Sequence, residues 1–482
     1  MAQTAVDTVS PQTGGKTGAE KGSAGKGSAG SPGKVALNLP TTIGSGTAGD
    51  PYLIGAGNGG YRALHYDLDL DYRVATNQLR ATATITLVAT MRLDRFSLDF
   101  DGLSVDRVTV NGARPRKSVH TGRKLVVTPL TTMEAGERFE IAVRYRGAPH
   151  PLRSIWGEVG WEELLDGVLV AGQPCGAASW FPCNDHPSNK ATYRIAVSCE
   201  APYTVVSNGT LTAKSTRSGH TRWTFEVVEP MATYLASVMI GRYRSSAQQP
   251  VTAGGPAPVP ITLHFPTNLA HNVGVDFARL GEMVSVFSTT FGPYPFPGYS
   301  VVVTDDVLEI PLEAHGLAVF GRNHVDGNHG SDRLIAHELA HQWFGNSLTA
   351  AAWRDIWLQE GFACYAEWIW GEHAGGRTAE QSAVYHRGRL EAQPQDLLVG
   401  DPGPHNMFDD RVYKRGALAL HAVRRSLGDE VFFDTLRAWT RANRHGLVST
   451  DAFVEFVSIH TGSGEIRRII DRWIYRTARP KL

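Results

Sequence analysis

The sequence predicts a multidomain chain in which an antiparallel β region is followed by an α+β region that is mostly helical. Three observations support this fold class. The chain has 482 residues, which is too long for one typical domain. Between residues 58 and 245, apolar and polar residues alternate over many short runs, which is typical of strands with one buried face. In residues 246–482 the spacing of apolar residues becomes helical, and few strands are expected.

Residues 1–57 precede both regions and differ from them in composition. They are rich in Gly, Ser, Thr, Lys and Pro, and they include a near-repeat over residues 21–30. Such a segment offers too little apolar surface to offset the entropy that is lost on ordering. We therefore expect residues 1–57 to form a disordered tail, and we expect a chain that starts near Gly57 to fold normally.

The β region begins sharply near Tyr61. Apolar side chains alternate with polar ones from Leu64 to Val74, which predicts a half-buried strand, and a second such run extends from Leu79 to Leu87. The Asn111-Gly112 pair predicts a tight turn. Further strands are expected at residues 96–100, 105–110, 123–128, 138–145, 191–198, 203–207, 221–228 and 233–240. Together these strands predict an antiparallel sandwich or saddle.

Charge and cysteine content exclude several classes of protein. The chain has 47 Lys and Arg against 47 Asp and Glu, so it offers no bulk attraction for nucleic acids or anionic membranes. No apolar run approaches the ~20 residues of a membrane span, and the first residues lack a signal-peptide pattern. Four cysteines are too few for a disulfide framework, although a Cys175–Cys183 bridge is an alternative to free thiols. We expect a cytoplasmic protein, with secretion as the alternative.

A metal-binding motif lies in the second region. His337, Glu338 and His341 form a His-Glu-x-x-His pattern within a largely apolar stretch. A helix of about 3.6 residues per turn brings the two histidines onto one face, where their imidazoles can hold one zinc ion. Glu338 projects beside them, within reach of water at the metal.

A catalytic zinc site needs a third protein ligand and leaves its fourth position to water. Glu360 offers this ligand, because the 18 residues between His341 and Glu360 leave room for a turn and an antiparallel second helix. The apolar run from Ile356 to Trp370 is compatible with that helix. The sequence therefore predicts one zinc ion per chain, held by two histidines and one glutamate.

The flanks of these residues resemble one known family. His-Gln-Trp-Phe-Gly-Asn at residues 341–346 and Trp-Leu-Gln-Glu-Gly-Phe-Ala at residues 357–363 are similar to stretches of the aminopeptidase N family of zinc metallopeptidases, which belongs to the gluzincin group. The resemblance covers about residues 60–482. It implies an N-terminal all-β domain, a thermolysin-like zinc catalytic domain, and the ligand set of His337, His341 and Glu360. Larger members continue into C-terminal helical domains, so this chain resembles a short form.

Two further stretches resemble the parts of the family that contact the substrate's amino group. One is the loop over residues 172–187, in which Gln173 falls where members carry a Glu or Gln. The other is residues 310–317, where Glu313 occupies the Glu of the family's Gly-x-Met-Glu-Asn pattern. Apart from Glu313, only Gly316 and Leu317 match the family strictly. Leu312 stands for Met, Ala314 for Asn and His315 for the aromatic residue. The resemblance implies that Glu313 and Gln173 bind the substrate's ammonium group.

Two residues nearer the C-terminus complete the predicted site. Residues 411–418 resemble the family's Tyr-x-Lys-Gly stretch, which implies that Tyr413 points its phenol at the scissile carbonyl. Glu367 lies seven residues after Glu360, hence on the same helical face, where it is placed to orient a zinc ligand. An ordinary surface carboxylate is the alternative for Glu367.

The resemblance implies a zinc aminopeptidase that removes residues from the free N-terminus of peptides, with Glu338 as the acid–base residue. Other functions stay open: an endopeptidase or an epoxide hydrolase on the same zinc site, or a catalytically silent peptide-binding module. We expect no nucleic-acid partner and no membrane span. The sequence leaves the oligomeric state open, with a monomer favoured.

Overall fold

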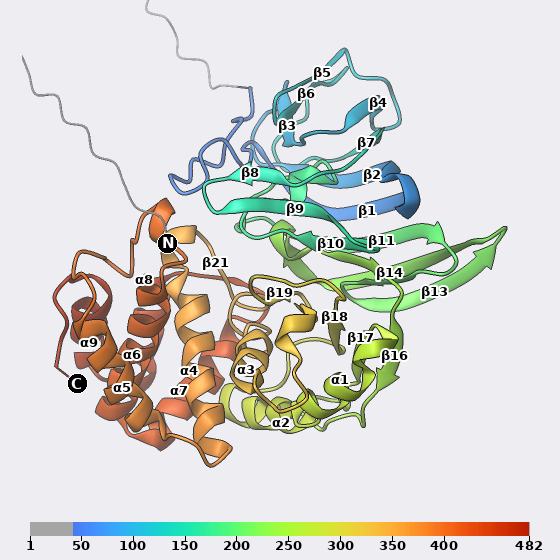
Figure 1. Ribbon diagram of the computed structural model, residues 1–482. Coiled ribbons are helices and arrows are strands. Elements are labelled where there is room, and N and C mark those ends of the chain that lie inside the picture. The colour runs from blue at the N-terminus through green and yellow to red at the C-terminus, as the bar shows by residue number, and fades with distance from the viewer. Residues whose placement is uncertain (1–41, 482) are drawn as a thin grey trace, which may run out of the picture. The chain divides into compact units, whose positions relative to one another are not determined.

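The computed structural model describes residues 42–481 of the chain. Strands β1 to β15 lie between residues 61 and 241, and helices α1 to α9 lie between residues 270 and 474 (Figure 1). This order of elements confirms the predicted fold class. No helix within residues 42–481 is long and apolar enough to cross a membrane.

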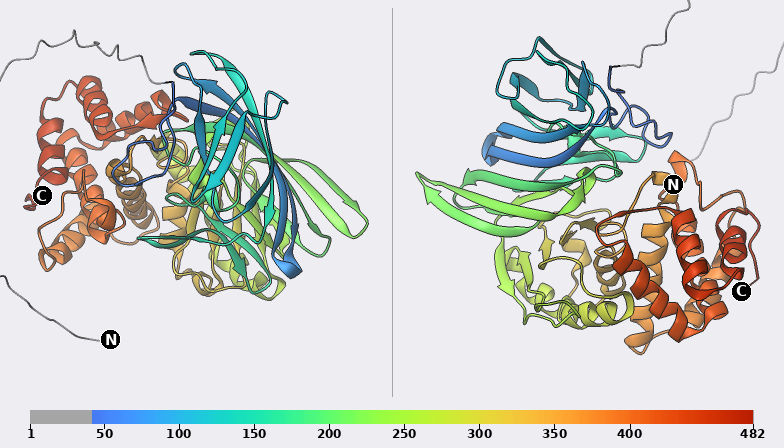
Figure 2. Two further views of the ribbon diagram at one scale, coloured as in Figure 1. Left: turned by 90° about the horizontal axis from the view of Figure 1, so that it is seen from above. Right: turned by 180° about the vertical axis from the view of Figure 1, so that it is seen from behind.

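A seven-stranded sheet forms the framework of the β region (Figures 1 and 2). In the order β13-β14-β11-β1-β2-β7-β4, its strands are Thr210–Arg217, His220–Ala232, Lys190–Glu200, Tyr61–Arg73, Gln78–Ala89, Arg138–Gly147 and Ser104–Val110. The predicted alternation of β1 appears in the fully buried side chains Tyr66, Leu68, Leu70 and Tyr72. One pair departs from the predicted antiparallel arrangement: β1 and β11 run parallel, with Leu68 opposite Ile195. The long connection between these strands allows the chain to return to the same end of the sheet.

Two smaller sheets complete the β region. One has the order β12-β15-β10-β9-β8, with strands Thr204–Ser207, Val238–Gly241, Gly167–Ala171, Gly157–Leu164 and Leu152–Ser154; the other has the order β3-β6-β5, with strands Phe96–Asp99, Lys124–Thr128 and Lys117–Thr121. Aromatic rings join the sheets. The ring of Tyr72 on β1 lies 5.0 Å from that of Trp161 on β9, and Trp161 lies 6.1 Å from Trp180. This ring cluster forms part of the predicted sandwich core.

Some elements of the β region were not predicted. Strand β13 has no buried residue, so it offers no hydrophobic alternation to detect. The strand expected at residues 233–240 is divided into a short 3₁₀ helix, Thr233–Leu235, and strand β15.

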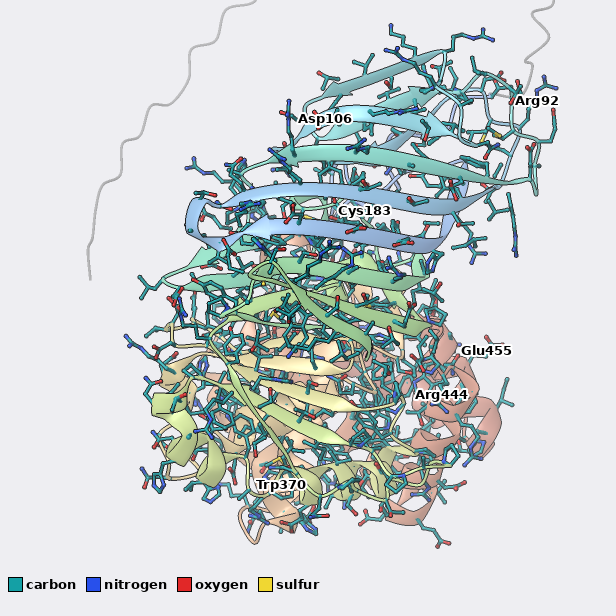
Figure 3. The ribbon with its side chains drawn as sticks, turned by 90° about the vertical axis from the view of Figure 1, so that its right-hand side faces the viewer. Arg92, Asp106, Cys183, Trp370, Arg444 and Glu455 are labelled. Carbon is teal, nitrogen blue, oxygen red and sulfur yellow. The ribbon has the colours of Figure 1, made fainter. Side chains whose placement is uncertain are left out.

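The interior position of Cys183 contrasts with Arg92 and Asp106, which project from the surface (Figure 3). Cys175 and Cys183 are free thiols, so the alternative of a disulfide between them is wrong.

The second region contains a sheet of its own, which is more strand structure than expected. Its order is β16-β17-β18-β20-β19, with strands Arg244–Ala247, Ile261–Phe265, Tyr299–Val303, Leu317–Phe320 and Leu312–Ala314. Strands β17, β18 and β20 run parallel, and such buried parallel strands lack the alternation that marks half-exposed ones. Strand β19 runs antiparallel at the edge, with Glu313 opposite Ala318, so one side of its backbone is free of strand pairing.

The helices of this region include α4, which packs against α2, α3, α5 and α6. They are α1 (Ala270–Asp276), α2 (Leu280–Phe291), α3 (Asp332–Ala340), α4 (Trp357–His373), α5 (Ala379–Glu391), α6 (Asp410–Leu427), α7 (Asp429–Ala442), α8 (Thr450–Thr461) and α9 (Glu465–Ile474), with a small β21–β22 pair (Thr349–Ala350 and Leu447–Val448). Every residue of α4 from Trp357 to Trp370 is buried, as expected for a helix with neighbours on all sides. Helices α3 and α6 are two of these neighbours (Figure 1).

The prediction of a disordered tail over residues 1–57 is wrong for its last part. Tyr52 is only 4% exposed, and its hydroxyl donates a 2.5 Å hydrogen bond to Asp401 Oδ1 and accepts one of 2.8 Å from the Gly403 backbone N–H. Asp50 Oδ2 accepts a 3.4 Å hydrogen bond from the Trp353 backbone. Residues 42–57 therefore pack on the body of the protein through the buried side chains of Tyr52 and Leu53. The rest of the predicted tail lies outside the described residues.

Removal of residues 42–57 is therefore expected to destabilise the protein. A chain that starts at residue 58 loses the burial of Tyr52 and Leu53, each worth about 1.5–3 kcal/mol. We expect its free energy of unfolding to be lower by at least about 3 kcal/mol than that of a chain starting at residue 42, measured by urea titration. Ile54→Ala is the control, because Ile54 is 92% exposed and its replacement should change little. Equal unfolding curves for the two chains would contradict the prediction.

Candidate metal centre and active site

The two histidines of the motif are presented by α3 and the residue that follows it. His337 lies in the last turn of α3, and His341 follows Ala340, the final residue of the helix. Their rings lie 4.8 Å apart, centroid to centroid. Buried apolar residues on α3, such as Ile335 and Leu339, hold this helix against its neighbours and so fix both rings. The predicted helical face is therefore present.

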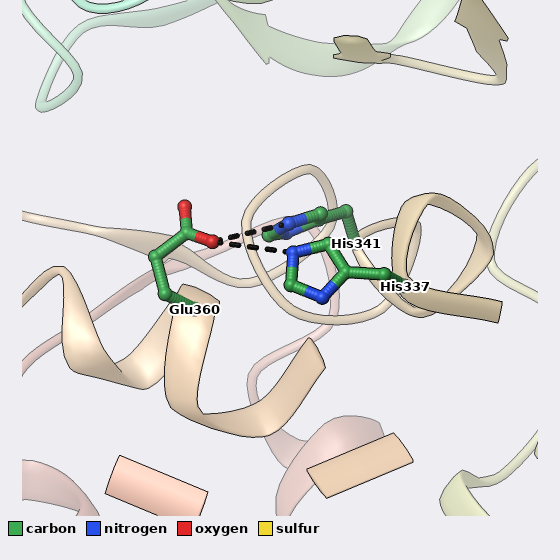
Figure 4. A group of neighbouring side chains, drawn as sticks. All are labelled: His337, His341 and Glu360. Atoms are coloured by element: carbon green, nitrogen blue, oxygen red, sulfur yellow. Dashed lines mark ion pairs between the residues drawn. The ribbon is translucent and has the colours of Figure 1, made fainter. Parts of the chain in front are cut away.

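Glu360 reaches both rings from the first turn of α4 (Figure 4). Its Oε2 lies 3.5 Å from His337 Nε2 and 3.4 Å from His341 Nε2. Zinc binds nitrogen and oxygen at about 2.0–2.2 Å, so the edges of a tetrahedron around it are about 3.4 Å long. The two distances from Glu360 match this edge length, all three donor atoms lie within 4.8 Å of one another, and all three residues are buried. The residues therefore fit a zinc ion with one position left open.

Hydrogen bonds on the far side of each imidazole set its orientation. His337 Nδ1 lies 2.8 Å from Glu367 Oε1, and His341 Nδ1 lies 3.0 Å from the carbonyl oxygen of Phe344. Each Nδ1–H thus donates outward, which leaves the Nε2 lone pair for the metal. Glu367 is buried, so the alternative of a surface carboxylate is wrong. Burial opposes its ionisation, but the hydrogen bond with His337 and the charge of Lys414 lower the pKa of Glu367 to about 2.

Glu338 lies beside the three donors and is only 4% exposed. Within the described part of the chain, its Oε2 has no hydrogen-bond partner. Burial raises the pKa of this carboxyl to about 7, partly offset by the nearby histidines. A carboxylate with a free oxygen and a near-neutral pKa is suited to accept and return a proton.

Glu313 and Gln173 meet next to Glu338, although 140 positions separate them in the sequence. Gln173 Nε2 donates a 2.6 Å hydrogen bond to Glu313 Oε1. One ligand atom each from Glu313, Glu338 and His341 lie within 4.8 Å of one another. Gln173 comes from the loop after β10, and Glu313 comes from edge strand β19. The predicted ammonium-binding pair is thus brought together at the metal site.

Tyr413 lies beside His337, in the first turn of α6. Its ring stacks on His337 with 6.0 Å between centroids and an angle of 18° between planes. Burial, together with the carboxylates of Glu360 and Glu313, raises the pKa of the phenol well above its usual range. Tyr413 therefore keeps its proton and is a hydrogen-bond donor at neutral pH.

Two residues of the motif's flank have structural roles that the sequence analysis missed. Gln342 Oε1 accepts a 2.9 Å hydrogen bond from the Gly316 backbone N–H, and Gln342 Nε2 donates one of 3.2 Å to the carbonyl oxygen of Ala314. Asn346 Nδ2 donates a 2.9 Å hydrogen bond to the same oxygen. Both residues are fully buried, and they attach strand β19, which carries Glu313, to the segment that carries His341. The sequence signal that could have revealed these roles is the presence of polar side chains inside an apolar stretch.

His315, which replaces an aromatic residue of the family pattern, packs as one. Its ring lies 4.0 Å from that of Phe296, and within residues 42–481 neither of its nitrogens has a hydrogen-bond partner. Burial lowers the pKa of this imidazole well below its usual value, so the ring is neutral. The departure from the pattern therefore leaves the turn after Glu313 intact.

Comparison with known proteins agrees with this architecture. Residues 277–473 match the Peptidase family M1 domain, and residues 62–235 match the Peptidase M1 N-terminal domain. The M1 zinc metallopeptidase from Deinococcus radiodurans is 30% identical, with a TM-score of 0.82 over 90% of this chain and 98% of that chain. These matches and the donor set define a protein with a mononuclear zinc site. The chain belongs to peptidase family M1, and its cofactor is zinc.

More distant relatives are longer than this chain. Human endoplasmic reticulum aminopeptidase 1 is 25% identical over 414 residues, which are 77% of this chain and 42% of that protein. Bovine aminopeptidase N is 28% identical over 343 residues, which are 64% of this chain and 35% of that protein. The chain thus spans less than half the length of these curated relatives.

The contact between His337 and Glu367 predicts the behaviour of one variant. Glu367→Gln should lower the affinity for zinc by about 10- to 100-fold, because an amide orients the imidazole less strongly and makes it less basic. Competition with a chelator of known affinity measures this change. Glu372→Gln is the matched control on the same helix, where the carboxylate pairs with Arg424. Equal zinc affinity in the two variants would show that Glu367 does not support the metal site.

Proposed function

We propose that this chain is a zinc aminopeptidase that hydrolyses the N-terminal residue from peptides. The observation that carries the proposal is the position of Glu313, whose carboxylate lies within 4.8 Å of donor atoms of Glu338 and His341. An anionic group so close to the hydrolytic site suits a substrate whose ammonium group lies one residue from the scissile bond. The names of the relatives support the same activity. So does a related structure from Deinococcus radiodurans, which is bound to a Tyr-Ser-Ala substrate.

We assign the chemical steps to two side chains. When bound to His337, His341 and Glu360, zinc supplies Lewis-acid chemistry that polarises a carbonyl group and acidifies water. Glu338 accepts a proton as water attacks the scissile carbonyl, and it delivers that proton to the leaving amine. The Tyr413 hydroxyl donates a hydrogen bond to the oxygen on which negative charge develops. Glu367 keeps the His337 ring in place throughout.

In this proposal, the amino end of the substrate is bound by polar and charged side chains, and the rest of the peptide is bound by backbone groups of strand β19. Glu313 and Gln173 hold the α-ammonium group, which sets the cut after the first residue. The free side of β19 offers backbone groups to an extended peptide, as in other cases of strand addition. Leu312 and Ala314 replace the Met and Asn of the family pattern, and these differences in side chain leave the backbone groups unchanged.

We further propose a boundary between the two domains near residue 245, where strand β16 joins the second region's sheet. A cytoplasmic location is supported by the four cysteines, none of which forms a disulfide. A monomer remains our proposal for the oligomeric state, with peptides that carry a free N-terminus as the partners.

Glu338→Gln should retain zinc and lose about 10²- to 10⁴-fold in kcat, because an amide cannot transfer the proton. Zinc content by atomic absorption and turnover of an aminoacyl p-nitroanilide measure the two properties. Glu430→Gln, an exposed position on α7, is the control and should keep both. Normal turnover of Glu338→Gln with zinc bound would remove this residue from the mechanism.

The aminopeptidase proposal is tested by blocking the substrate's amino group. One charge-assisted hydrogen bond corresponds to about 10- to 100-fold in kcat/KM, so free-amine peptides should exceed their N-acetylated forms by at least this factor. Glu313→Ala should lower kcat/KM for the free-amine peptides. It should also reduce the ratio of their kcat/KM to that of the N-acetylated peptides. Glu309→Ala, an exposed position four residues earlier, is the control.

Mass spectrometry of the products separates the alternatives. Internal cleavage of acetylated peptides at the same rate identifies an endopeptidase. Hydrolysis of an epoxide without peptide cleavage identifies an epoxide hydrolase. A zinc-loaded chain that turns over none of these substrates identifies a silent peptide-binding module.

A further inference from the structure

Lys190 connects the β region to the loop that follows the metal helix. It is the first residue of β11, and its Nζ donates hydrogen bonds to the carbonyl oxygens of Asn346 at 3.1 Å, Ser347 at 2.8 Å and Gly446 at 3.4 Å. Asn346 and Ser347 come shortly after His341 in the sequence. One side chain of the β region thus reaches three backbone oxygens of the second region.

The amino group of Lys190 has no acidic partner. The residue as a whole is half-buried, but its amino group lies deep enough for burial to lower its pKa to about 7, and no carboxylate in the described part of the chain offsets this effect. The titratable groups nearby are bases as well: burial and the charge of Lys190 lower the pKa of His315, and burial, Arg444 and Lys190 lower that of His445 to about 4. An amino group in such surroundings costs folding free energy. Its contribution therefore lies in what it holds in place.

The hydrogen bonds of Lys190 continue into the turn that carries His341. Each of two consecutive peptide units accepts a hydrogen bond from Lys190 through its oxygen and donates one through its N–H to a carbonyl oxygen of that turn. The donated bonds are 3.1 Å from the Ser347 N–H to Gln342 and 3.0 Å from the Leu348 N–H to Trp343. Hydrogen bonds in such a chain polarise and strengthen one another. Lys190 therefore stabilises the backbone directly after His341.

The same loop contacts a zinc ligand and the strand that carries Glu313. His341 Nδ1 donates a 3.0 Å hydrogen bond to the carbonyl oxygen of Phe344. Asn346 Nδ2 donates one of 2.9 Å to the carbonyl oxygen of Ala314, the residue after Glu313. A displacement of the loop over residues 344–348 would therefore reach both the metal site and Glu313.

We propose that Lys190 is a positioning residue, which acts through the loop over residues 344–348 on the zinc ligand His341 and on Glu313. Lys190 forms hydrogen bonds with the loop backbone, and it contacts neither the metal donors nor Glu313 within residues 42–481. The effect on Glu313 rests on the proposed aminopeptidase function, whereas the effect on His341 concerns zinc binding alone. Loss of the amino group should let the loop move, which weakens zinc binding and misplaces the carboxylate that receives the substrate's ammonium group.

The test uses Lys190→Met, which removes the amino group and keeps a side chain of similar length. Competition with a chelator of known affinity should show about tenfold weaker zinc binding, as for the loss of a group that orients a ligand. In the zinc-loaded variant, KM for alanine p-nitroanilide should rise about tenfold, as for one charge-assisted hydrogen bond, and kcat should change less. The KM of N-acetylalanine p-nitroanilide should change little, because it brings no ammonium group to Glu313.

Tyr52→Phe is the matched control. It also removes a polar contact between an N-terminal segment and the second region, but the Tyr52 hydroxyl bonds Asp401 and Gly403, which lie outside the loop. This variant should keep the zinc affinity and both KM values. Urea unfolding shows which variants are folded. If Lys190→Met does not fold, Lys190→Gln takes its place, because a neutral amide has fewer donors and a shorter reach.

The outcomes separate positioning from a purely structural role. A folded Lys190 variant with lowered stability but unchanged zinc affinity and KM overturns the proposal, and so do equal losses in Tyr52→Phe. Failure of both Lys190 variants to fold makes Lys190 part of the fold itself and also overturns it. If the wild-type chain does not cleave alanine p-nitroanilide, the aminopeptidase function fails together with the effect on Glu313. The comparison of zinc affinities then still decides the effect on His341.

Discussion

The contact between Gly361 on α4 and Gly416 on α6 is the constraint on which the geometry of the metal site depends. A Cβ atom at Gly361 would lie 2.8 Å from the Cα of Gly416, so the two helix backbones approach more closely than a larger residue allows. Glu360 directly precedes Gly361, and Tyr413 lies one turn before Gly416. The close approach therefore sets the separation between the third zinc ligand and the phenol. Larger side chains at the two glycines would move Glu360 and Tyr413 apart, although neither glycine contacts the metal.

The β region takes part in the site as directly as the helices do. Lys190 at the start of β11 donates hydrogen bonds of 3.1 and 2.8 Å to the carbonyl oxygens of Asn346 and Ser347, in the loop that follows His341. The Tyr234 hydroxyl donates one of 3.2 Å to Gly345 in the same loop. Asn346 in turn contacts the strand that carries Glu313. The loop after the metal helix is thus held from both regions, and the β region also supplies Gln173.

The sequence predicts the metal site more completely than the fold around it. His337, His341 and Glu360 could be named because helical spacing and ligand chemistry restrict which residue types can serve at which distance. Gln173 and Glu313 needed the family resemblance, since nothing local indicates that residues so distant in sequence will meet. The packing of Tyr52 and Leu53 was missed because two buried residues in a glycine-rich segment make no periodic pattern. The parallel pairing of β1 and β11 was missed because alternation defines a strand's faces and says nothing of its direction.

Four glutamates surround the two histidines, and their surroundings give them different protonation behaviour. Burial raises the pKa of Glu338 to about 7, and it also raises the pKa of Glu313. Burial acts on Glu360 in the same direction, but the adjacent His341 and His337 lower its pKa to about 2. Glu367 behaves like Glu360, since it too contacts an imidazole.

The two carboxylates that contact imidazoles are therefore fixed as anions, which suits a zinc ligand and the group that orients one. Glu338 is buried and Glu313 is half-buried, and desolvation favours the uncharged form of both carboxyls. For Glu338 this tendency suits its proposed role as a proton acceptor that also releases its proton near neutral pH. In the proposed function, an ammonium group that arrives at Glu313 supplies the missing positive charge, so that substrate binding completes the charge balance of the site. Identical side chains thus acquire separate roles because only two of them touch a histidine.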